Sequence, residues 1–262
     1  MADMQSAKIN ISEIFYSIQG EGLLAGRPSV FVRLAGCPLR CKYCDTEYAL
    51  DSSAGTKMSI DQAIEKTMKY SPAYVVITGG EPMISPNISL LCQRIKEHNI
   101  HPAPFVPDSK DDQNAGTSAE TYRLLRSDEQ NKRCGVHITI ETAGIKYVAN
   151  LACDLMSISP KTSNAYENAQ NKNRYLKIDR LKELTANYNY QLKFVMDKIE
   201  DITEVHQILN DLKDFDRSKV LLMPQAKNIS EYLKKSPLIV ELCKANGFIF
   251  SPRLQLCFPD QK

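Results

Sequence analysis

Residues 28–44 read PSVFVRLAGCPLRCKYC, an apolar run that leads directly into three closely spaced cysteines. Because β-branched and aromatic residues favour strands, we expect a strand at 28–34 that ends at the cysteine loop. Three thiolates on one short loop can each bind a different iron of a cubane cluster, and the candidates are Cys37, Cys41 and Cys44. The fourth iron would then have no protein ligand and could bind a small molecule.

Other interpretations of this loop stay open on spacing alone. A structural zinc site normally needs four Cys or His ligands, and no fourth ligand follows at finger-like spacing. The histidines lie at positions 98, 101, 137 and 206, remote in sequence, although folding could bring one close. Three thiols without a metal are a further alternative. We expect ordinary buried thiols at the remaining cysteines, which are Cys92, Cys134, Cys153, Cys243 and Cys257.

Outward from the loop, short apolar runs alternate with longer segments of helical period. The pattern predicts strands at 28–34, 74–78, 136–140, 155–158, 190–196 and 220–223, and helices at 59–70, 88–99, 173–187, 202–213 and 229–246. Expected N-caps are Ser59 and Asn87, Gly247 is the expected C-terminal stop, and Pro237 should break or kink the last helix. Such alternation indicates an α/β fold with a parallel sheet. About six units are too few for the usual eight, so we predict an incomplete (partial) βα barrel of about six strands.

Length and composition fit one domain over residues 1–262, with a surface insertion at 102–133 where polar residues and prolines interrupt the rhythm. A formal net charge of +2 gives no electrostatic reason to expect nucleic acid or a membrane as partner. The first ten residues hold no apolar signal core, and no run has the length of a membrane span. We therefore expect a cytoplasmic protein whose cysteines are reduced or bound to metal.

Four polar motifs lie where predicted strands end, which is where parallel βα folds carry their chemistry. They are Thr78-Gly79-Gly80-Glu81-Pro82, Glu141-Thr142-Ala143-Gly144, Ser159-Pro160-Lys161 and Met223-Pro224-Gln225. Paired glycines let a ligand approach the backbone closely, and a carboxylate just past an apolar strand can meet a polar ligand. Any one of these motifs is more often a turn than a site, but four at successive strand ends indicate a site.

With these motifs the chain resembles the radical S-adenosylmethionine (SAM) superfamily, in which C-x3-C-x2-C follows the first strand and GGEP follows the second. Within it, the chain is similar to the family of 7-carboxy-7-deazaguanine synthases across most of its length. The discriminating pieces are S-x-Q-G-E-G at 17–22 and C-D-T at 44–46. The alternative within the superfamily is a glycyl-radical activase, a class that shares the cysteine spacing but acts on a protein partner.

The resemblance implies a lyase of queuosine and 7-deazapurine biosynthesis, with a [4Fe-4S] cluster on the three cysteines, SAM, and Mg²⁺ on the Thr46 hydroxyl. It implies conversion of 6-carboxy-5,6,7,8-tetrahydropterin to 7-carboxy-7-deazaguanine with loss of ammonia, a flavodoxin- or ferredoxin-like electron donor, and a homodimer. The implied SAM-side residues are Tyr43, Gly79, Gly80, Glu81, Ser159, Lys161 and Gln225, and the implied substrate residues are Gln19, Gly20, Glu21, Arg33, Glu141 and Gln255. The chain departs from the family in its tail, 256–262, which lacks a Trp-Gly ending.

Overall fold

The computed structural model describes residues 7–100, 134–167 and 175–258, which form one nine-stranded sheet and a separate two-stranded one. The order in the large sheet is β11-β10-β9-β8-β7-β4-β2-β1-β3. From β2 to β11 every neighbouring pair is parallel, whereas β1 is antiparallel to both β2 and β3. The predicted surface insertion at 102–133 lies outside the described residues.

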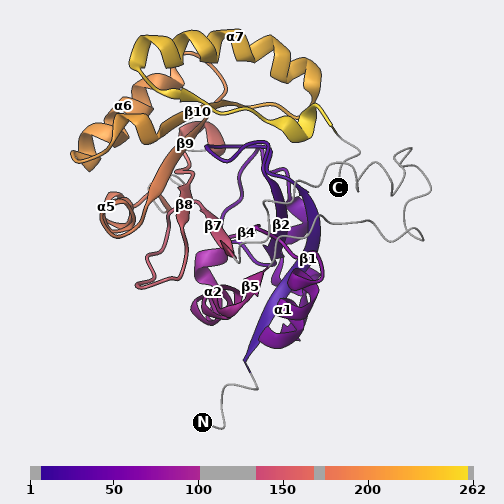
Figure 1. Cartoon of the computed structure of the whole chain (residues 1–262). Coiled ribbons are helices and arrows are strands. Elements are labelled where there is room, and N and C mark those ends of the chain that lie inside the picture. Colours follow the sequence, from indigo (N-terminus) through magenta and orange to yellow (C-terminus); the bar gives the residue numbers. More distant parts are fainter. Residues whose placement is uncertain (1–6, 101–133, 168–174, 259–262) are drawn as a thin grey trace.

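The elements alternate along the chain as the sequence pattern predicts. The strands are β1 (Lys8–Ile18), β2 (Pro28–Leu34), β3 (Thr56–Ser59), β4 (Tyr74–Gly79), β5 (Asn99–Ile100), β6 (Cys134–Gly135), β7 (His137–Thr142), β8 (Leu155–Ile158), β9 (Tyr190–Met196), β10 (Val220–Pro224) and β11 (Ile249–Phe250). The helices are α1 (Ile60–Met68), α2 (Ile88–Glu97), α5 (Ile178–Asn187), α6 (Asp201–Leu212) and α7 (Ile229–Asn246). Figure 1 shows these helices in an arc around the outer side of the curved sheet.

The α/β class and the mostly parallel sheet are confirmed, and the open curved sheet fits a partial barrel. All six predicted strands are present, but the sheet is larger than expected because β1, β3 and β11 join it. The residues of β1 alternate between apolar and polar only up to Ser12, and three consecutive apolar or aromatic residues, Ile14 to Tyr16, interrupt the pattern by which a strand is recognised. The other two additions are short, at four and two residues.

Helix ends follow the expected chemistry with two differences. Ser59 forms a capping box with Gln62, and Gly247 ends α7 in the left-handed conformation at φ +65°. Asn87 precedes α2 but makes no capping bond, since its amide donates to the carbonyl oxygen of Lys8 (2.7 Å). Pro237 was expected to break or kink the last helix, and α7 runs through it without a break. Pro237 lies on the exposed side of the helix, where a carbonyl without its helical partner can bind water.

The two faces of the large sheet have different roles. In β9, the side chains of Leu192, Phe194 and Met196 are fully buried in the core that the helices cover. The alternating side chains of Lys193 and Val195 instead line a cavity on the opposite face. Among the described residues, no helix is long and apolar enough to cross a membrane.

Candidate active site

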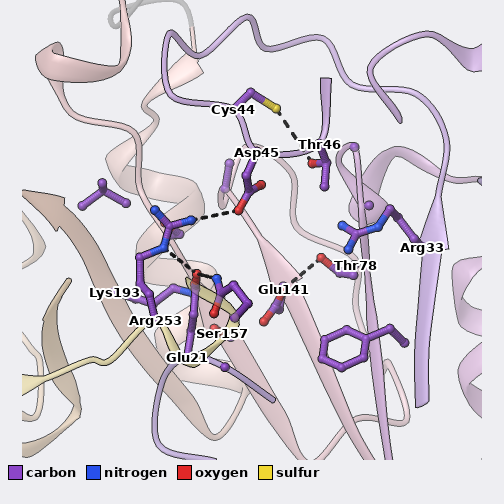
Figure 2. A pocket seen from close by; sticks show the side chains of 18 of the residues that line it. Glu21, Arg33, Cys44, Asp45, Thr46, Thr78, Glu141, Ser157, Lys193 and Arg253 are labelled. Atoms are coloured by element: carbon purple, nitrogen blue, oxygen red, sulfur yellow. Dashed lines mark hydrogen bonds and ion pairs between the residues drawn. The ribbon is translucent and has the colours of Figure 1, made fainter. Parts of the chain in front are cut away.

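A cavity of about 460 Å³ lies over the carboxyl ends of the parallel strands (Figure 2). The sheet register places polar side chains of neighbouring strands side by side. Arg33 of β2 is paired with Thr78 of β4, and Glu141 of β7 is paired with Ser157 of β8. All four of these residues line the cavity. Parallel strands thus bring side chains that are far apart in sequence to one edge of the sheet.

The structure brings almost all of the predicted site residues together. The predicted residues that line the cavity are Gln19, Gly20, Glu21, Arg33, Cys37, Cys41, Tyr43, Cys44, Thr46, Gly79, Gly80, Glu141, Ser159, Lys161 and Gln255. Glu81 and Gln225 are not among the lining residues. The predicted residues therefore share one cavity, with two exceptions.

The two exceptions are held by other partners. The Glu81 carboxylate is buried and accepts hydrogen bonds from Thr142 Oγ1 (2.7 Å) and from the N–H groups of Ala143 (2.8 Å) and Met83 (3.1 Å). Its side chain thereby joins the turn after β4 to the turn after β7. The Gln225 side chain accepts a hydrogen bond from Lys235 Nζ (2.7 Å) of α7.

The cysteine loop is fixed to the fold at both ends. The N–H of Cys37 donates to the carbonyl oxygen of Leu50 (3.0 Å), and the N–H of Lys42 donates to that of Ala165 (2.9 Å). Between them, the Arg40 guanidinium donates to the carbonyl oxygen of Cys37 (2.7 Å). Backbone hydrogen bonds therefore help to set the path of the loop.

The thiols of this loop suit an iron–sulfur cluster. Cys37, Cys41 and Cys44 are free, half-buried and face the same cavity. A tetrahedral ion with metal–sulfur bonds of about 2.3 Å would need three or four ligands around one point, and the described residues contain no such group. A cubane cluster takes each thiolate on a different iron, so its sulfur ligands lie farther apart than the ligands of a single ion.

Burial affects the groups around this loop. It raises the pKa of the Cys37 thiol to about 11 and also raises the pKa of Cys41, so metal loading must release protons. The hydroxyl groups of Tyr43 and Tyr166 are buried beside the loop and have no hydrogen-bond partner in the described part of the chain. Buried polar groups without a partner fit a site that holds a further group.

A buried ion-pair network lies at the other end of the cavity. The Glu21 carboxylate pairs with Lys193 Nζ and with Arg253 Nε (3.2 Å), and it accepts a hydrogen bond from Gln255 Nε2 (2.6 Å). Burial alone would raise the pKa of Glu21, but Lys193 and Arg253 outweigh it and lower that pKa to about 2. Glu21 is therefore ionised, and its oxygen atoms are already occupied by protein cations and an amide.

Glu141 has a different set of partners. It accepts hydrogen bonds from Gln19 Nε2 (3.0 Å) and from Thr78 Oγ1 (2.8 Å), both neutral groups. No ion pair to Glu141 occurs among the described residues, although its charge contributes to raising the pKa of Lys193 against the effect of burial. Figure 2 shows the Glu141 and Thr78 side chains directed at one another at the cavity wall. Glu141 is thus the carboxylate with capacity for a ligand.

Another part of the cavity wall combines a cation with aromatic rings. Arg33 Nε pairs with Glu13 (2.7 Å), and its guanidinium lies 5.6 Å from the ring centroid of Phe15. Phe15 stacks on Phe31 at 5.0 Å, and both rings line the cavity. Arg33 therefore forms a salt bridge and lines the cavity at the same time. This wall can bind a flat, anionic molecule.

Sequence reasoning gave no role to several cavity residues, which are Asp45, Thr78, Ser157, Lys193 and Arg253, although Asp45 and Thr78 lie inside motifs that it singled out. One signal was present: Lys193 stands inside a run of apolar residues, YQLKFVM, where a lysine needs a buried partner. One expectation about the other cysteines is wrong, because Cys257 is exposed in the segment after β11, where no core forms. The side chain of Cys134 lies outside the described residues.

Known proteins share this sequence pattern and this fold. The family model described as the Radical SAM superfamily matches residues 32–213. A 7-carboxy-7-deazaguanine synthase of Pyrobaculum aerophilum is 31% identical over 95% of this chain and 94% of its own length. One of Rhodopirellula baltica is 29% identical over 97% of this chain and 88% of its own. The crystal structure of QueE from Escherichia coli has a TM-score of 0.61 at 22% identity and covers 95% of both chains, which supports the fold.

Proposed function

Because the chain belongs to the radical SAM superfamily and, within it, to the family of 7-carboxy-7-deazaguanine synthases, we propose that it converts 6-carboxy-5,6,7,8-tetrahydropterin to 7-carboxy-7-deazaguanine with loss of ammonia. One observation supports this most: the cysteine loop, Thr46 and the carboxylate of Glu141 line a single cavity. A metal end and a hydrogen-bonding end thus face the same space, as a radical reaction on a bound heterocycle requires.

The cofactor end is assigned to the cysteine loop and the turns beside it. Superfamily membership implies a [4Fe-4S] cluster and SAM, and when bound these supply a 5′-deoxyadenosyl radical that abstracts a substrate hydrogen. Cys37, Cys41 and Cys44 would hold the cluster. Lys161, whose Nζ donates to Ser159 Oγ (2.9 Å), would bind the carboxylate or ribose of SAM, since both residues line the cavity.

Thr46 is assigned as a Mg²⁺ ligand through its hydroxyl. Its Oγ1 lies 3.8 Å from Cys44 Sγ, so an ion on Thr46 would be adjacent to the cluster end of the cavity. Mg²⁺ takes hard oxygen ligands and often joins one protein group to a substrate anion. The substrate carboxylate would therefore complete the site, with the Arg33 guanidinium as a second anion-binding group.

Glu141 is assigned to the guanidine-like edge of the pterin. That edge presents paired N–H donors, and a carboxylate binds such donors through both oxygen atoms. Glu141 is held by neutral donors only, whereas Glu21 already binds Lys193, Arg253 and Gln255. We therefore assign Glu21 to holding the two cations in place beneath the substrate, and not to direct recognition of the ring edge.

Two protein partners complete the proposal, both suggested by the resemblance to the family. The cluster would receive its electron from a flavodoxin- or ferredoxin-like protein, and the chain would act as a homodimer. Size-exclusion chromatography with light scattering tests the second point, and a mass equal to one chain contradicts it.

A product assay tests the reaction. The protein is loaded with iron and sulfide under anaerobic conditions and supplied with SAM, Mg²⁺, a reductant and the carboxypterin, and products are identified by mass spectrometry. We expect 7-carboxy-7-deazaguanine, and none from Glu141→Ala, which removes the proposed ring-edge acceptor. Formation of 5′-deoxyadenosine without this product would contradict the proposal that the carboxypterin is the substrate. Transfer of a radical to a glycyl-radical protein would indicate an activase instead.

A further inference from the structure

The segment after β11 is bound along the loop between β1 and β2. The N–H of Leu254 donates to the carbonyl oxygen of Gly20 (3.0 Å), and the N–H of Gly22 donates to Ser251 Oγ (2.9 Å). A Cβ atom on Gly20 would lie 3.2 Å from the backbone nitrogen of Gln255, so the two backbones approach each other closely here. The two segments therefore form one wall of the cavity, with Arg253 at its centre.

The Arg253 guanidinium joins three separate parts of the chain. Its Nε pairs with Glu21 (3.2 Å), its Nη1 donates to the carbonyl oxygen of Ala226, and its Nη2 pairs with Asp45 (3.0 Å). The side chain is only 8% exposed. Figure 2 shows it between Glu21 on one side and Asp45 on the other. Arginine alone among the side chains presents donors in a fixed fork that can serve several acceptors at once.

The ion pair with Asp45 connects the Arg253 network to the residues proposed to hold the cluster and Mg²⁺. Asp45 stands between Cys44 and Thr46, the residues assigned to the cluster and to Mg²⁺. Its carboxylate is 61% exposed, and Arg253 is the hydrogen-bond partner that the structure shows for it. An exposed carboxylate would normally move freely, whereas a charge-assisted bond to a buried, fixed guanidinium holds it.

We propose that Arg253 is a positioning residue that, through Asp45, fixes the 44–46 turn relative to Glu21. This inference rests on the proposed function. The Arg253–Asp45 pair would set the distance between the metal end and the ring end of the cavity. The substrate must span this distance, with its carboxylate at the metal end and its ring at the other. A displacement of about 1 Å in such a site is enough to lower turnover by a large factor.

Hydrogen–deuterium exchange of the cluster-loaded protein tests the positioning directly. The turn has its own protected amides, since Cys44 N–H donates to the Cys41 carbonyl oxygen (3.1 Å) and Ala49 N–H donates to that of Thr46 (2.9 Å). Arg253→Gln and Asp45→Asn should each speed exchange over residues 42–51 by roughly tenfold, the factor for one charge-assisted hydrogen bond. Arg253→Lys, which keeps the charge but not the fork, should give an intermediate rate.

A double-mutant cycle separates this role from the alternatives. If the two residues act through one another, Asp45→Asn combined with Arg253→Gln should exchange no faster than either alone. Arg180→Gln is the matched control, because it removes an arginine from an exposed pair with Glu183 far from the cavity. Unchanged exchange over 42–51, additive effects of the two changes, or faster exchange throughout the core would each overturn the proposal.

Turnover gives a second readout. Both variants should load iron as the wild type does and should need roughly tenfold more Mg²⁺ for half-maximal product formation. Wild-type protein that forms no product would reject the proposed function, but the exchange measurements would still decide whether Arg253 positions the turn. Variants that turn over with an unchanged Mg²⁺ requirement would overturn the inference alone.

Discussion

A Cβ atom built on Gly80 would lie 2.2 Å from the carbonyl oxygen of Gly36, so the GGEP turn touches the start of the cysteine loop backbone to backbone. Two hydrogen bonds accompany the contact, from the N–H of Gly80 to the Leu34 carbonyl oxygen and from the N–H of Glu81 to that of Gly36, both 2.9 Å. The position of the thiols is therefore fixed by the next turn of the barrel. Backbone packing against Gly36 is therefore one reason for the glycine at position 80 of the GGEP motif.

Gly80→Ala should consequently displace the cysteine loop. We expect a loss of about 1–3 kcal/mol in the free energy of unfolding, as for other insertions into closely packed positions. Iron content after anaerobic loading should fall well below that of the wild type. Gly135→Ala is the matched control, because nothing lies within 4 Å of a Cβ atom there. Full iron loading of Gly80→Ala would show that the contact does not hold the loop.

Replacing any one of Cys37, Cys41 and Cys44 by Ala should abolish cluster binding and SAM cleavage together. Each thiolate would hold a separate iron, so loss of one leaves the cluster without a full set of ligands. Iron and acid-labile sulfide analysis measures the first effect, and 5′-deoxyadenosine formation measures the second. Cys257→Ala, at an exposed position, should change neither. A variant of the three that keeps a complete cluster would remove that residue from the ligand set.

Thr46→Ala should leave the cluster intact and weaken Mg²⁺-dependent turnover. The expected effect is a Mg²⁺ requirement raised roughly tenfold or more, because the hydroxyl is the only oxygen ligand proposed from the protein. Thr46→Ser keeps the hydroxyl and should restore the wild-type requirement. If Thr46→Ala keeps full activity and an unchanged response to Mg²⁺, the assignment as a metal ligand is wrong.

Glu21 should make stability depend on acid pH. Its pKa is lowered from 4.5 to about 2 in the folded chain, so the unfolded chain takes up the proton first as the pH falls. The stabilisation is fully present above pH 4.5 and is lost as the pH falls toward 2, with a magnitude of about 3 kcal/mol. Urea denaturation of the wild type and Glu21→Gln measures it, and the variant should lose less stability over this range.

The matched control for this pH effect is Glu183→Gln. Glu183 pairs with Arg180 at an exposed site, where the side chains are 40% and 49% accessible. Such pairs contribute little to stability, so this variant should follow the wild type at every pH. A Glu21→Gln protein with the same acid dependence as the wild type would mean that the Glu21 network does not contribute.

Local sequence was enough to predict the cysteine loop and the strands beside it. The strand β2 and the loop that follows it are adjacent in the chain, and the thiol spacing is a property of a few residues. The GGEP turn at the end of β4 and Glu141 near the end of β7 could be placed in the same site, because parallel strands end at one edge of the sheet. These predictions needed only the local residue pattern and the rule that parallel strands end at one edge of the sheet.

The remaining contacts depend on long-range packing. Arg253 and Asp45 are 208 residues apart, and Lys193 and Glu21 are 172 apart, so no local pattern pairs them. The Glu81 carboxylate, expected on the SAM side, binds Thr142 and the backbone of the adjacent turn instead. Strand β1 was missed because its apolar and polar residues alternate only up to Ser12, after which Ile14, Phe15 and Tyr16 follow one another.

Transfer of label from substrate to cofactor tests the central claim most directly. Carboxypterin deuterated on the carbons of its reduced ring is supplied to the cluster-loaded protein with SAM, Mg²⁺ and reductant, and the label is followed by mass spectrometry. We predict deuterium in SAM or in 5′-deoxyadenosine together with formation of 7-carboxy-7-deazaguanine, and neither with Cys41→Ala. Product that forms while both SAM and 5′-deoxyadenosine stay unlabelled would contradict a radical reaction on this substrate in this cavity.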